Sequence, residues 1–587
     1  MKVQLIIFFI SNKDAIVCFD VIDSDSNLSD HRPIVLCCNG VLLADMFVNM
    51  GEVRGQPQCR SKITRLCWNH ADLSSYFNTT GELLQPVLDE LCRLEDNNDT
   101  KPDSIEHIYH SITDAVIYSQ ATSVPRCKEN FFKFWWDDEL KEAKQKSVAS
   151  CRLWKSMGRP KSGAVYDNYR KDKAAYKLEI RAKEGEDKQV YTNELHEALL
   201  RKQGTAFWKC WGSKFNAGRC TVSHVNGITD PTEIVNNFAR YFEKVCTGNT
   251  ISGADRLRKE YEAMRKGYCG KCMSAGEVDI DAELVESVIR KMKRGKAPGL
   301  DVITAEHLQF CHYMLPCILA KLFNLIIQSS CVPTDFGKSY TVPILKVSNG
   351  YGKSLTVEDF RGVSISPVIS KVLEHCILDR YEFLFETCDN QFGFKKRLGC
   401  RDAVYMFRCV VDYYVSCGST VNVGALDLSK AFDKMNHHGL FIKLMERRIP
   451  DNLLRFLENW FSLGVTCVKW ESFTSDFFVL SSGIRQGGVL SPYLFAVYID
   501  SVIMKVAASN VGCHIKWICI NILIYADDIL LLAPSISALQ ELIHVCQNEL
   551  EWLDMTINVK KSVCMRIGAR CEVDCVNIVT TSKVPDP

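Results

Sequence analysis

The sequence predicts an α+β fold that is divided into several domains. The chain has 587 residues, of which 47% are hydrophobic and 24% charged, enough apolar side chains for several cores. Between residues 275 and 568 short apolar segments alternate with segments of helical periodicity, which favours sheets covered by helices. Residues 131–215 have helical spacing throughout. These observations exclude a disordered chain.

The first 40 residues contain short apolar or alternating segments, which are QLIIFFI, AIVCFDVI and PIVLCC. Polar turns separate these segments, so we expect β-strands from one edge of a β-sandwich. The opening apolar run passes into SNKD without a small-residue cleavage site, and we expect no secretory signal. The 28 scattered cysteines then indicate an intracellular, reducing compartment with mostly free thiols.

Long basic helices are predicted for residues 131–215. Between Lys133 and Lys214 there are 19 Lys or Arg and 12 Asp or Glu, a net charge of +7 in a chain whose total charge is +1. One interpretation is contact with template RNA, in which Lys and Arg neutralise phosphates and aromatic rings stack on bases. The other is a solvated helical linker packed through its tryptophans, which are Trp135, Trp136, Trp208 and Trp211.

Two further segments carry structural signals. An amphipathic helix with an acidic first turn is expected at Asp281–Lys293, and its apolar face consists of Leu284, Val285, Val288, Ile289 and Met292. The apolar stretch Ile515–Ala533 resembles a membrane span in length, but it contains Asp527 and Asp528. Because a bilayer penalises such a pair, we predict two buried strands around a turn and no transmembrane segment.

Three segments carry the residues from which we predict chemistry. In VNVGALDLSKAFDKMNHHGL an apolar strand ends at Asp427 and is followed by Phe432 and a helix. SSGIRQGGVLSPYLFAVYID is a Gly-rich turn, with Gln486, before a helix that starts near Ser491. In NILIYADDILLLA two apolar strands flank the Asp527 pair. Each segment alone is more often a helix cap or a turn, and the joint occurrence in this order overturns that interpretation.

The three aspartates suit two-metal phosphoryl transfer. That reaction needs carboxylates from separate strands that converge on cations about 3.5–4 Å apart. Magnesium prefers oxygen ligands, and three unpaired carboxylates would repel one another without cations. We therefore expect Asp427, Asp527 and Asp528 to be catalytic residues that bind two Mg²⁺ ions, with Mn²⁺ as a possible substitute.

The order and wording of these segments resemble the reverse transcriptase of non-LTR (LINE-type) retrotransposons. Further similar segments are GKAPGLDVI, VPILK, FRGVSISPVISKVLE, NQFGFKKRLGCRDAV and INVKKS. The resemblance covers residues 275–568 and implies a right-hand polymerase whose palm is an antiparallel sheet backed by helices. It also implies an RNA-directed DNA polymerase, a nucleotidyltransferase that extends a primer 3′-hydroxyl with deoxynucleotides.

The same resemblance implies roles for individual residues. Phe432 lies where the family places an aromatic gate under the sugar, which excludes a 2′-hydroxyl. Gln486 and Gly487 would lie against the incoming nucleotide and the template. The remaining residues implied for the triphosphate are Lys346 and Arg361, which would neutralise its charge, and Lys561, which would donate a proton to pyrophosphate.

The N-terminal segment SNLSDHRPIVL resembles the last motif of the endonuclease that precedes the polymerase in these elements. That enzyme has an endonuclease/exonuclease/phosphatase-type fold, and Asp30 and His31 match its last catalytic pair. The rest of that active site would precede Met1, so we expect endonuclease activity to be lost. This motif also disfavours a cellular reverse transcriptase such as telomerase or an intron maturase.

The expected partners are an RNA template, a DNA primer and deoxynucleoside triphosphates, with no membrane, in the nucleus and cytoplasm. An alternative is an inactive, truncated element product that binds nucleic acid without catalysis. The expected domains are an endonuclease remnant (1–40), a connecting region (41–130), a basic helical linker (131–270), fingers (271–415), a palm (416–568) and a truncated start of the thumb (569–587).

Overall fold

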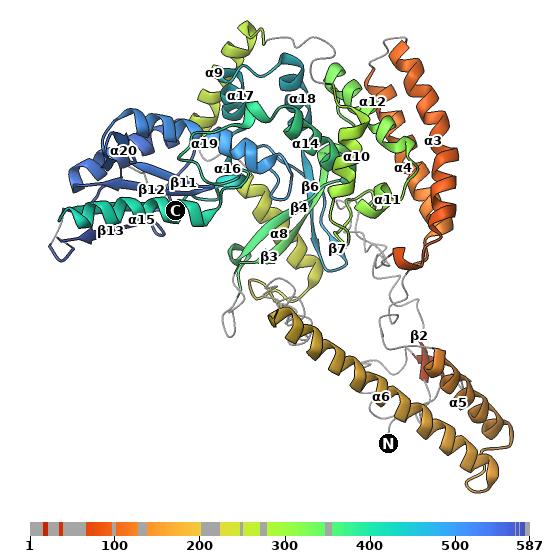
Figure 1. Ribbon diagram of the computed structural model, residues 1–587. Coiled ribbons are helices and arrows are strands. Elements are labelled where there is room, and N and C mark those ends of the chain that lie inside the picture. Colours follow the sequence, from red (N-terminus) through yellow and green to blue (C-terminus); the bar gives the residue numbers. More distant parts are fainter. Residues whose placement is uncertain are drawn as a thin grey trace. The chain divides into compact units, whose positions relative to one another are not determined.

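The structure is a computed structural model, and the chain divides into two compact units (Figure 1). One unit comprises residues 1–56 and 128–222, and the other comprises residues 57–127 and 223–587. The residues that the structure describes are 16–21, 34–38, 66–96, 101–126, 138–200, 224–246, 251–270, 279–346, 355–569, 571–573 and 576–580.

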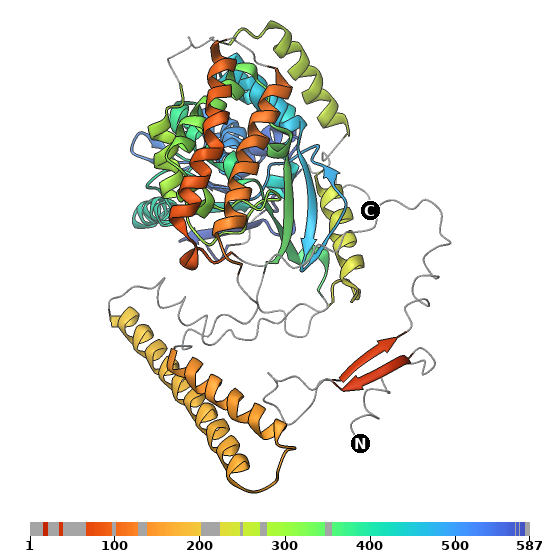
Figure 2. The ribbon, with the colours of Figure 1, turned by 90° about the vertical axis from the view of Figure 1, so that its right-hand side faces the viewer.

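The first unit contains a pair of strands and a pair of helices (Figure 2). Strands β1 (Ile16–Val21) and β2 (Ile34–Cys38) pair antiparallel, so two of the three predicted N-terminal strands are confirmed. The third predicted strand, QLIIFFI, lies outside the described residues. Helices α5 (Asp138–Ser156) and α6 (Ala164–Leu200) lie side by side, and the rings of Trp154 and Tyr169 stack at 4.6 Å.

A four-stranded antiparallel sheet forms the centre of the second unit. Its strand order is β11-β12-β5-β13. The β-branched and leucine residues of these strands fit a sheet that is covered on both faces. The bounds are β5 (Thr420–Leu426), β11 (Ile522–Tyr525), β12 (Asp528–Ala533) and β13 (Val563–Gly568).

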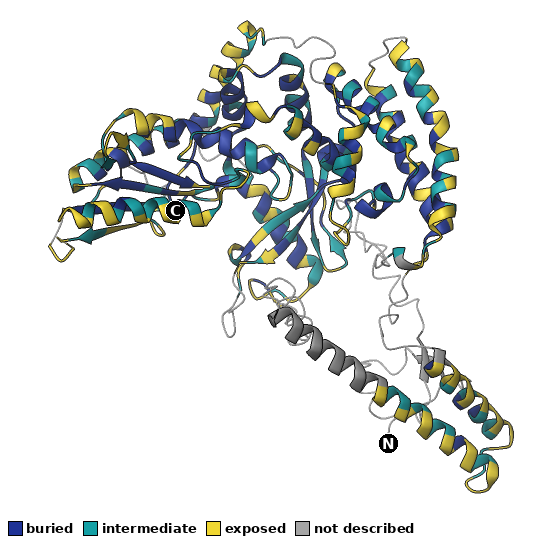
Figure 3. Ribbon diagram, viewed as in Figure 1, coloured by how far each residue is buried: buried dark blue, intermediate teal, exposed yellow. Residues whose placement is uncertain are grey.

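The two faces of this sheet belong to different cores. Figure 3 shows that β11 and β12 are mostly buried. Ile529 and Leu531 pack with α19 (Ser491–Ala508) and α20 (Ile536–Trp552) in the large core. Leu532, which follows Leu531, packs with α15 (Cys400–Ser416) in a smaller core, and the intervening Leu530 packs against the same core. Successive strand residues point to opposite faces, which explains this alternation.

A second sheet has the strand order β4-β3-β6-β7, with β8 also paired to β6. Strands β3 and β6 are parallel, whereas β3 and β4 are antiparallel. Helix α8 (Pro231–Val245) covers this sheet, and its Phe238 ring meets Phe360 edge-on at 5.0 Å. The bounds are β3 (Lys338–Leu345), β4 (Phe360–Ile365), β6 (Val465–Trp470), β7 (Phe473–Thr474) and β8 (Phe478–Val479).

The remaining described elements of this unit are mostly helices around the two sheets. They are η2 (Trp68–His70), α3 (Leu73–Asp96), α4 (Pro102–Ser123), α9 (Ile251–Gly267), α10 (Ala282–Lys291), α11 (Ala305–Gln309), α12 (Met314–Ser329), α13 (Thr334–Gly337), η3 (Val357–Asp359), α14 (Val368–Arg380), η4 (Glu382–Phe385), α16 (Ala431–Lys434), α17 (His437–Glu446), α18 (Asp451–Ser462), β9 (His514–Ile515) and β10 (Ile518–Cys519). The predicted helix at residues 281–293 is confirmed as α10, whose N-terminus is capped by the Asp281 carboxylate.

Parts of the expected connecting region (41–130) and of the expected linker (131–270) belong to this second unit. The Tyr76 hydroxyl of α3 donates to the carbonyl of His307 at 3.1 Å, and the Trp68 ring meets the His307 ring edge-on. Burial lowers the pKa of His307 to about 4, so this contact holds a neutral ring at neutral pH. The expected linker 131–270 is divided, because α5 and α6 belong to the first unit and α8 and α9 to the second.

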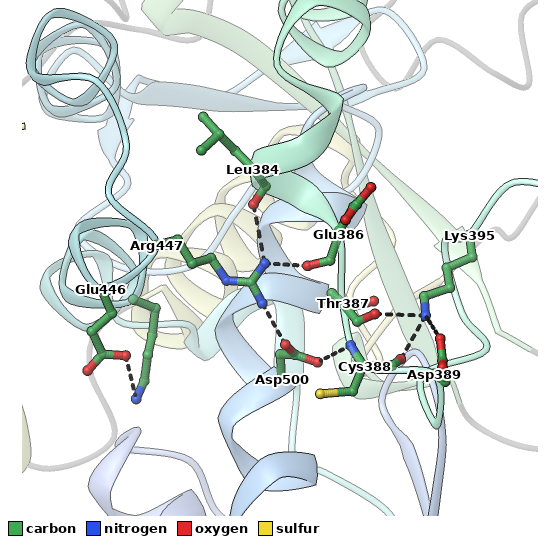
Figure 4. A network of polar contacts seen from close by, with 10 residues as sticks. Leu384, Glu386, Thr387, Cys388, Asp389, Lys395, Glu446, Arg447 and Asp500 are labelled. Atoms are coloured by element: carbon green, nitrogen blue, oxygen red, sulfur yellow. Dashed lines mark hydrogen bonds and ion pairs between the residues drawn. The ribbon is translucent and has the colours of Figure 1, made fainter. Parts of the chain in front are cut away.

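Helix α19 is the one described helix long and apolar enough to cross a membrane, and 67% of its apolar window is buried. The apolar stretch Ile515–Ala533 contains β11 and β12 around a turn, as predicted. Figure 4 shows how α19 is anchored: Arg447 donates to the buried Asp500 carboxylate, which also accepts from the backbone N of Cys388 at 2.9 Å. The burial of α19 accounts for its apolar composition as a core helix.

Candidate active site

The four-stranded sheet brings the predicted aspartates to one end. Asp427 directly follows β5, whose last residue Leu426 pairs with Ile529 of β12. Asp528 is the first residue of β12, and Asp527 lies in the turn that joins β11 to β12. The carboxyl end of β5 therefore adjoins the start of β12, and the predicted arrangement of strand, aspartate and hairpin is confirmed.

One cavity collects eight of the nine residues for which the sequence predicts catalytic or nucleotide-binding roles. Its empty volume is about 1540 Å³, including space open to solvent. Asp528 does not line this cavity, and its side chain is exposed. The eight predicted residues that line it are Lys346, Arg361, Asp427, Phe432, Gln486, Gly487, Asp527 and Lys561.

Asp427 is held by the segment that precedes β13. Its Oδ2 accepts a hydrogen bond from Nδ2 of Asn558 at 3.1 Å and lies 3.6 Å from Nζ of Lys561. Its backbone carbonyl also accepts from the backbone N of Asn558 at 2.8 Å. These contacts fix the orientation of a carboxylate that is only partly buried.

The surroundings of Asp527 disfavour its ionised form. Burial raises the pKa of its carboxyl group, and the negative charges of Asp528 and Asp427 raise it further. A cation beside these groups would favour the ionised form of Asp527.

Among the described residues, no group of three or more His, Cys, Asp or Glu side chains is arranged to hold a metal ion. Asp427 and Asp527 nevertheless line one cavity and offer carboxylate oxygens, the donor type that magnesium prefers. The donor chemistry therefore fits magnesium through two carboxylates.

Phe432 is fixed by two other aromatic side chains. Its ring stacks on Phe495 of α19 at 4.5 Å and meets Phe394 edge-on at 6.0 Å. Phe432 lies on the short helix α16 (Ala431–Lys434), five residues after Asp427. The ring is therefore a rigid wall of the cavity near the carboxylates.

The loop that carries Gln486 and Gly487 is pressed against β4. The carbonyl of Gln486 accepts from the backbone N of Ser364 at 2.8 Å, and its Nε2 donates to Asp433 at 3.0 Å. Gly487 has φ +129°, and a Cβ there would lie 2.4 Å from the carbonyl oxygen of Ser364. Only glycine suits this conformation and this approach.

Basic side chains from three elements face the same cavity. Lys346 directly follows β3, Arg361 lies on β4, and Lys561 precedes β13. Burial lowers the pKa of Lys346, and the positive charges of Lys561, Lys430 and Arg361 lower it further. The cavity thus holds mutually repelling cations beside partly buried carboxylates, a distribution that suits an anionic ligand together with metal ions.

The structure adds three residues that sequence reasoning missed. Asp433 hydrogen-bonds to Gln486, and burial raises the pKa of its carboxyl group. Nζ of Lys430 lies 4.6 Å from the centre of the Tyr241 ring, and both residues line the cavity. Asp433 and Lys430 belong to the LDLSKAFDKM segment, so proximity to Phe432 was an available signal, whereas Tyr241 lies in α8 outside every motif. The predicted endonuclease pair, Asp30 and His31, lies outside the described residues.

Part of this chain is similar to known proteins. Residues 346–581 match the family described as reverse transcriptase (RNA-dependent DNA polymerase). The Pol polyprotein of the type-2 retrotransposable element R2DM of Drosophila melanogaster is 24% identical over 381 residues, covering 63% of this chain and 33% of that protein. The RNA-directed DNA polymerase from the mobile element jockey of the same fly is 26% identical over 302 residues, covering 48% and 31%. The chain thus spans about a third of the length of these relatives.

Among solved structures, apo telomerase from Candida tropicalis matches with 14% identity and a TM-score of 0.30, over 40% of this chain and 51% of that one. With the family match and the site together, the chain contains a reverse transcriptase domain. Within that class, the relatives described above come from retrotransposable or mobile elements, R2 and jockey, and the chain is similar to them.

Proposed function

We propose that this chain is an RNA-directed DNA polymerase that extends a primer 3′-hydroxyl with deoxynucleotides on an RNA template. The observation that carries this proposal is the single cavity in which Asp427 and Asp527 lie with Phe432, Gln486 and the three basic side chains. In the reaction, the primer 3′-oxygen bonds to the α-phosphorus of the nucleotide. The bond between that phosphorus and the oxygen bridging to the β-phosphate breaks, and pyrophosphate leaves.

The position of each residue in the cavity implies its role in this reaction. Asp427 and Asp527 would hold two Mg²⁺ ions, which when bound polarise the α-phosphate and the 3′-hydroxyl. Lys346 and Arg361 would neutralise the triphosphate from the second sheet. Lys561, whose ammonium group is exposed beside Asp427, would protonate the pyrophosphate. Asp528 would act on the charge of Asp527, since it does not line the cavity.

Phe432 would select deoxynucleotides over ribonucleotides. Its ring cannot retreat, because Phe495 stacks behind it at 4.5 Å. A 2′-hydroxyl directed at such a wall would clash, and a rigid wall discriminates better than a mobile one. Gln486 and Gly487 would contact the incoming nucleotide and the template.

The proposed architecture is that of a right-hand polymerase. The four-stranded sheet with α19 and α20 would form the palm (416–568), and the sheet around β3 and β4 would belong to the fingers (271–415). Residues 569–587 would begin a thumb. Strands β1 and β2 fit a remnant of an endonuclease-type β-sandwich at residues 1–40.

The expected partners are an RNA template, a DNA primer and deoxynucleoside triphosphates. Helices α5 and α6 are candidates for contact with template RNA, because their exposed faces are rich in Lys and Arg. An inactive nucleic-acid-binding product remains the second candidate. The observation in its favour is that no three metal-binding side chains converge among the described residues.

Primer extension on poly(rA)/oligo(dT) with dTTP and Mg²⁺ tests the proposal. We expect incorporation by the wild type and its loss in an Asp527→Asn, Asp528→Asn double variant. Asp412→Asn is a matched control, since Asp412 is an exposed aspartate on α15 whose carboxylate contacts only Arg408. Equal incorporation by the wild type and the double variant would exclude the polymerase. Binding of the duplex without incorporation would support the inactive product.

A further inference from the structure

The loop that carries Gln486 and Gly487 borders a second cavity on its rear side. Arg485 and Gly488 line this cavity between α17, α18 and α19, and its empty volume is about 570 Å³, including space open to solvent. Most side chains around that cavity are apolar, and they include Trp460 and Leu494. Because space lies behind part of the loop, side-chain packing alone does not hold Gln486 and Gly487 from that side.

Buried polar groups hold the loop instead. Glu374 of α14 is 5% exposed, and its Oε2 accepts hydrogen bonds from the backbone N of Val489 at 2.5 Å and of Leu490 at 2.8 Å. Leu490 immediately precedes α19, so the carboxylate lies at the N-terminal, electropositive end of that helix. At the other end of the loop, Nη1 of Arg485 donates to the carbonyl of Phe336 at 2.8 Å, and Nη2 donates to that of Gly337.

These contacts lie on either side of Gln486 and Gly487, which line the large cavity. Arg485 precedes Gln486, and Val489 follows Gly487 after one residue. Gln486 itself contacts Ser364 and Asp433 only through its carbonyl and its Nε2. A change in the backbone at residues 489–490 would therefore move Gln486 and Gly487 relative to Asp433 and β4.

We propose that Glu374 is a positioning residue for nucleotide binding, which acts through the backbone of Val489 and Leu490 to set Gln486 and Gly487 in the active-site cavity. Glu374 lines only the rear cavity and not the one with the carboxylates, so it does not contact substrate. This inference rests on the proposed polymerase function.

Two variants, Glu374→Leu and Glu374→Gln, distinguish a positioning role of Glu374 from a general contribution to stability. Leucine leaves both backbone N–H groups without an acceptor, whereas glutamine keeps an oxygen that can accept them. We expect Glu374→Leu to raise the KM for dTTP by roughly 10- to 100-fold while kcat changes by less than about threefold. Glu374→Gln should restore most of the wild-type KM.

Asp500→Leu is the matched control. Asp500 is also a buried carboxylate that accepts one backbone N–H and an arginine, but it holds residues 384–388 rather than the loop (Figure 4). The Asp500→Leu variant should therefore have a lower Tm than the wild type and an unchanged KM for dTTP. Gly488→Ala strains the same loop from its own side, because its Cβ would lie 2.6 Å from Oγ of Ser491 and 3.3 Å from Oε2 of Glu374. It should raise the KM even if Glu374→Leu does not fold.

The outcomes are distinguishable. If the wild type does not extend the primer, the proposed function fails. If the wild type is active but Glu374→Leu lowers Tm as Asp500→Leu does and leaves the KM unchanged, Glu374 is only a structural residue and the inference is wrong. An unchanged KM in a folded Gly488→Ala variant would contradict it as well.

Discussion

Nζ of Lys561 lies 3.6 Å from Oδ2 of Asp427, the carboxylate oxygen that also accepts a hydrogen bond from Asn558. The Lys561 side chain is 69% exposed, so its attraction to Asp427 is screened by solvent and adds little to stability. The pair therefore suggests a functional rather than a structural role for this lysine, in a cavity where other basic side chains already repel one another.

Lys561→Gln should lower kcat for single-nucleotide incorporation by roughly 10- to 100-fold, because a proton donor beside the carboxylates is lost. Tm should change by less than about 1 °C, since exposed pairs contribute little. Pre-steady-state incorporation kinetics and thermal unfolding measure the two effects. Lys560→Gln is the control, because Lys560 is exposed and does not line the cavity. An equal loss in both variants would count against a specific role for Lys561.

Asp527→Asn should abolish incorporation and yet stabilise the protein at neutral pH. Burial and the charges of Asp528 and Asp427 raise the pKa of Asp527, so the folded state binds its proton more tightly than the unfolded state does. The ionised carboxylate therefore costs stability above that raised pKa, and asparagine removes this cost. We expect Tm of metal-free protein to rise by about 1–2 °C at pH 7.5. The gain should vanish near pH 3, where the aspartate is protonated in both states. A lower Tm of the variant at pH 7.5 would show that the ionised Asp527 carboxylate does not destabilise the folded state.

Asp528→Asn should shift the pH dependence of Mg²⁺ binding. The negative charge of Asp528 helps to raise the pKa of Asp527, and protons compete with the metal for that carboxylate. Removing the charge lowers the pKa, so the midpoint at which Mg²⁺ affinity falls on acidification should move to lower pH. Isothermal titration calorimetry at several pH values measures this midpoint. An unchanged midpoint would mean that Asp528 is electrostatically remote from the metal site.

Phe432→Val should admit ribonucleotides. Shortening the side chain removes the ring that stacks on Phe495, and space opens where a 2′-hydroxyl would lie. The ratio of kcat/KM for dTTP to that for UTP should fall by roughly 10- to 100-fold. Phe432→Tyr keeps the ring and should keep most of the selectivity. If valine leaves the ratio unchanged, the gate lies elsewhere.

Lys346→Ala and Arg361→Ala should each weaken nucleotide binding more than primer–template binding. Both side chains line the cavity, and the two residues extend from the ends of neighbouring strands. We expect the KM for dTTP to rise by roughly 10-fold in each variant, with a weaker dependence of KM on salt than in the wild type. Fluorescence anisotropy of a labelled duplex provides the comparison, and an equal loss of duplex affinity would assign these residues to the template instead.

The sequence by itself determined the local elements of the site. Apolar runs that end in aspartate at Asp427 and Asp527 predict strands that end there, because the hydrophobic pattern and the turn residues are local signals. The same reasoning identified the capped helix α10 and the hairpin that resembled a membrane span. The motifs also indicated the class of enzyme, since their order along the chain is readable without a structure.

Only the tertiary structure decided which side chains meet. Asp527 and Asp528 are adjacent in sequence, yet only Asp527, which lies in the turn, lines the cavity, whereas Asp528 begins β12 and is exposed. Lys346 and Lys561 reach one cavity from distant parts of the chain because two sheets converge there. Asp433 is partly buried and Glu374 is buried, and each forms hydrogen bonds with the loop that carries Gln486. Local sequence predicts neither the burial of these side chains nor their distant hydrogen-bond partners.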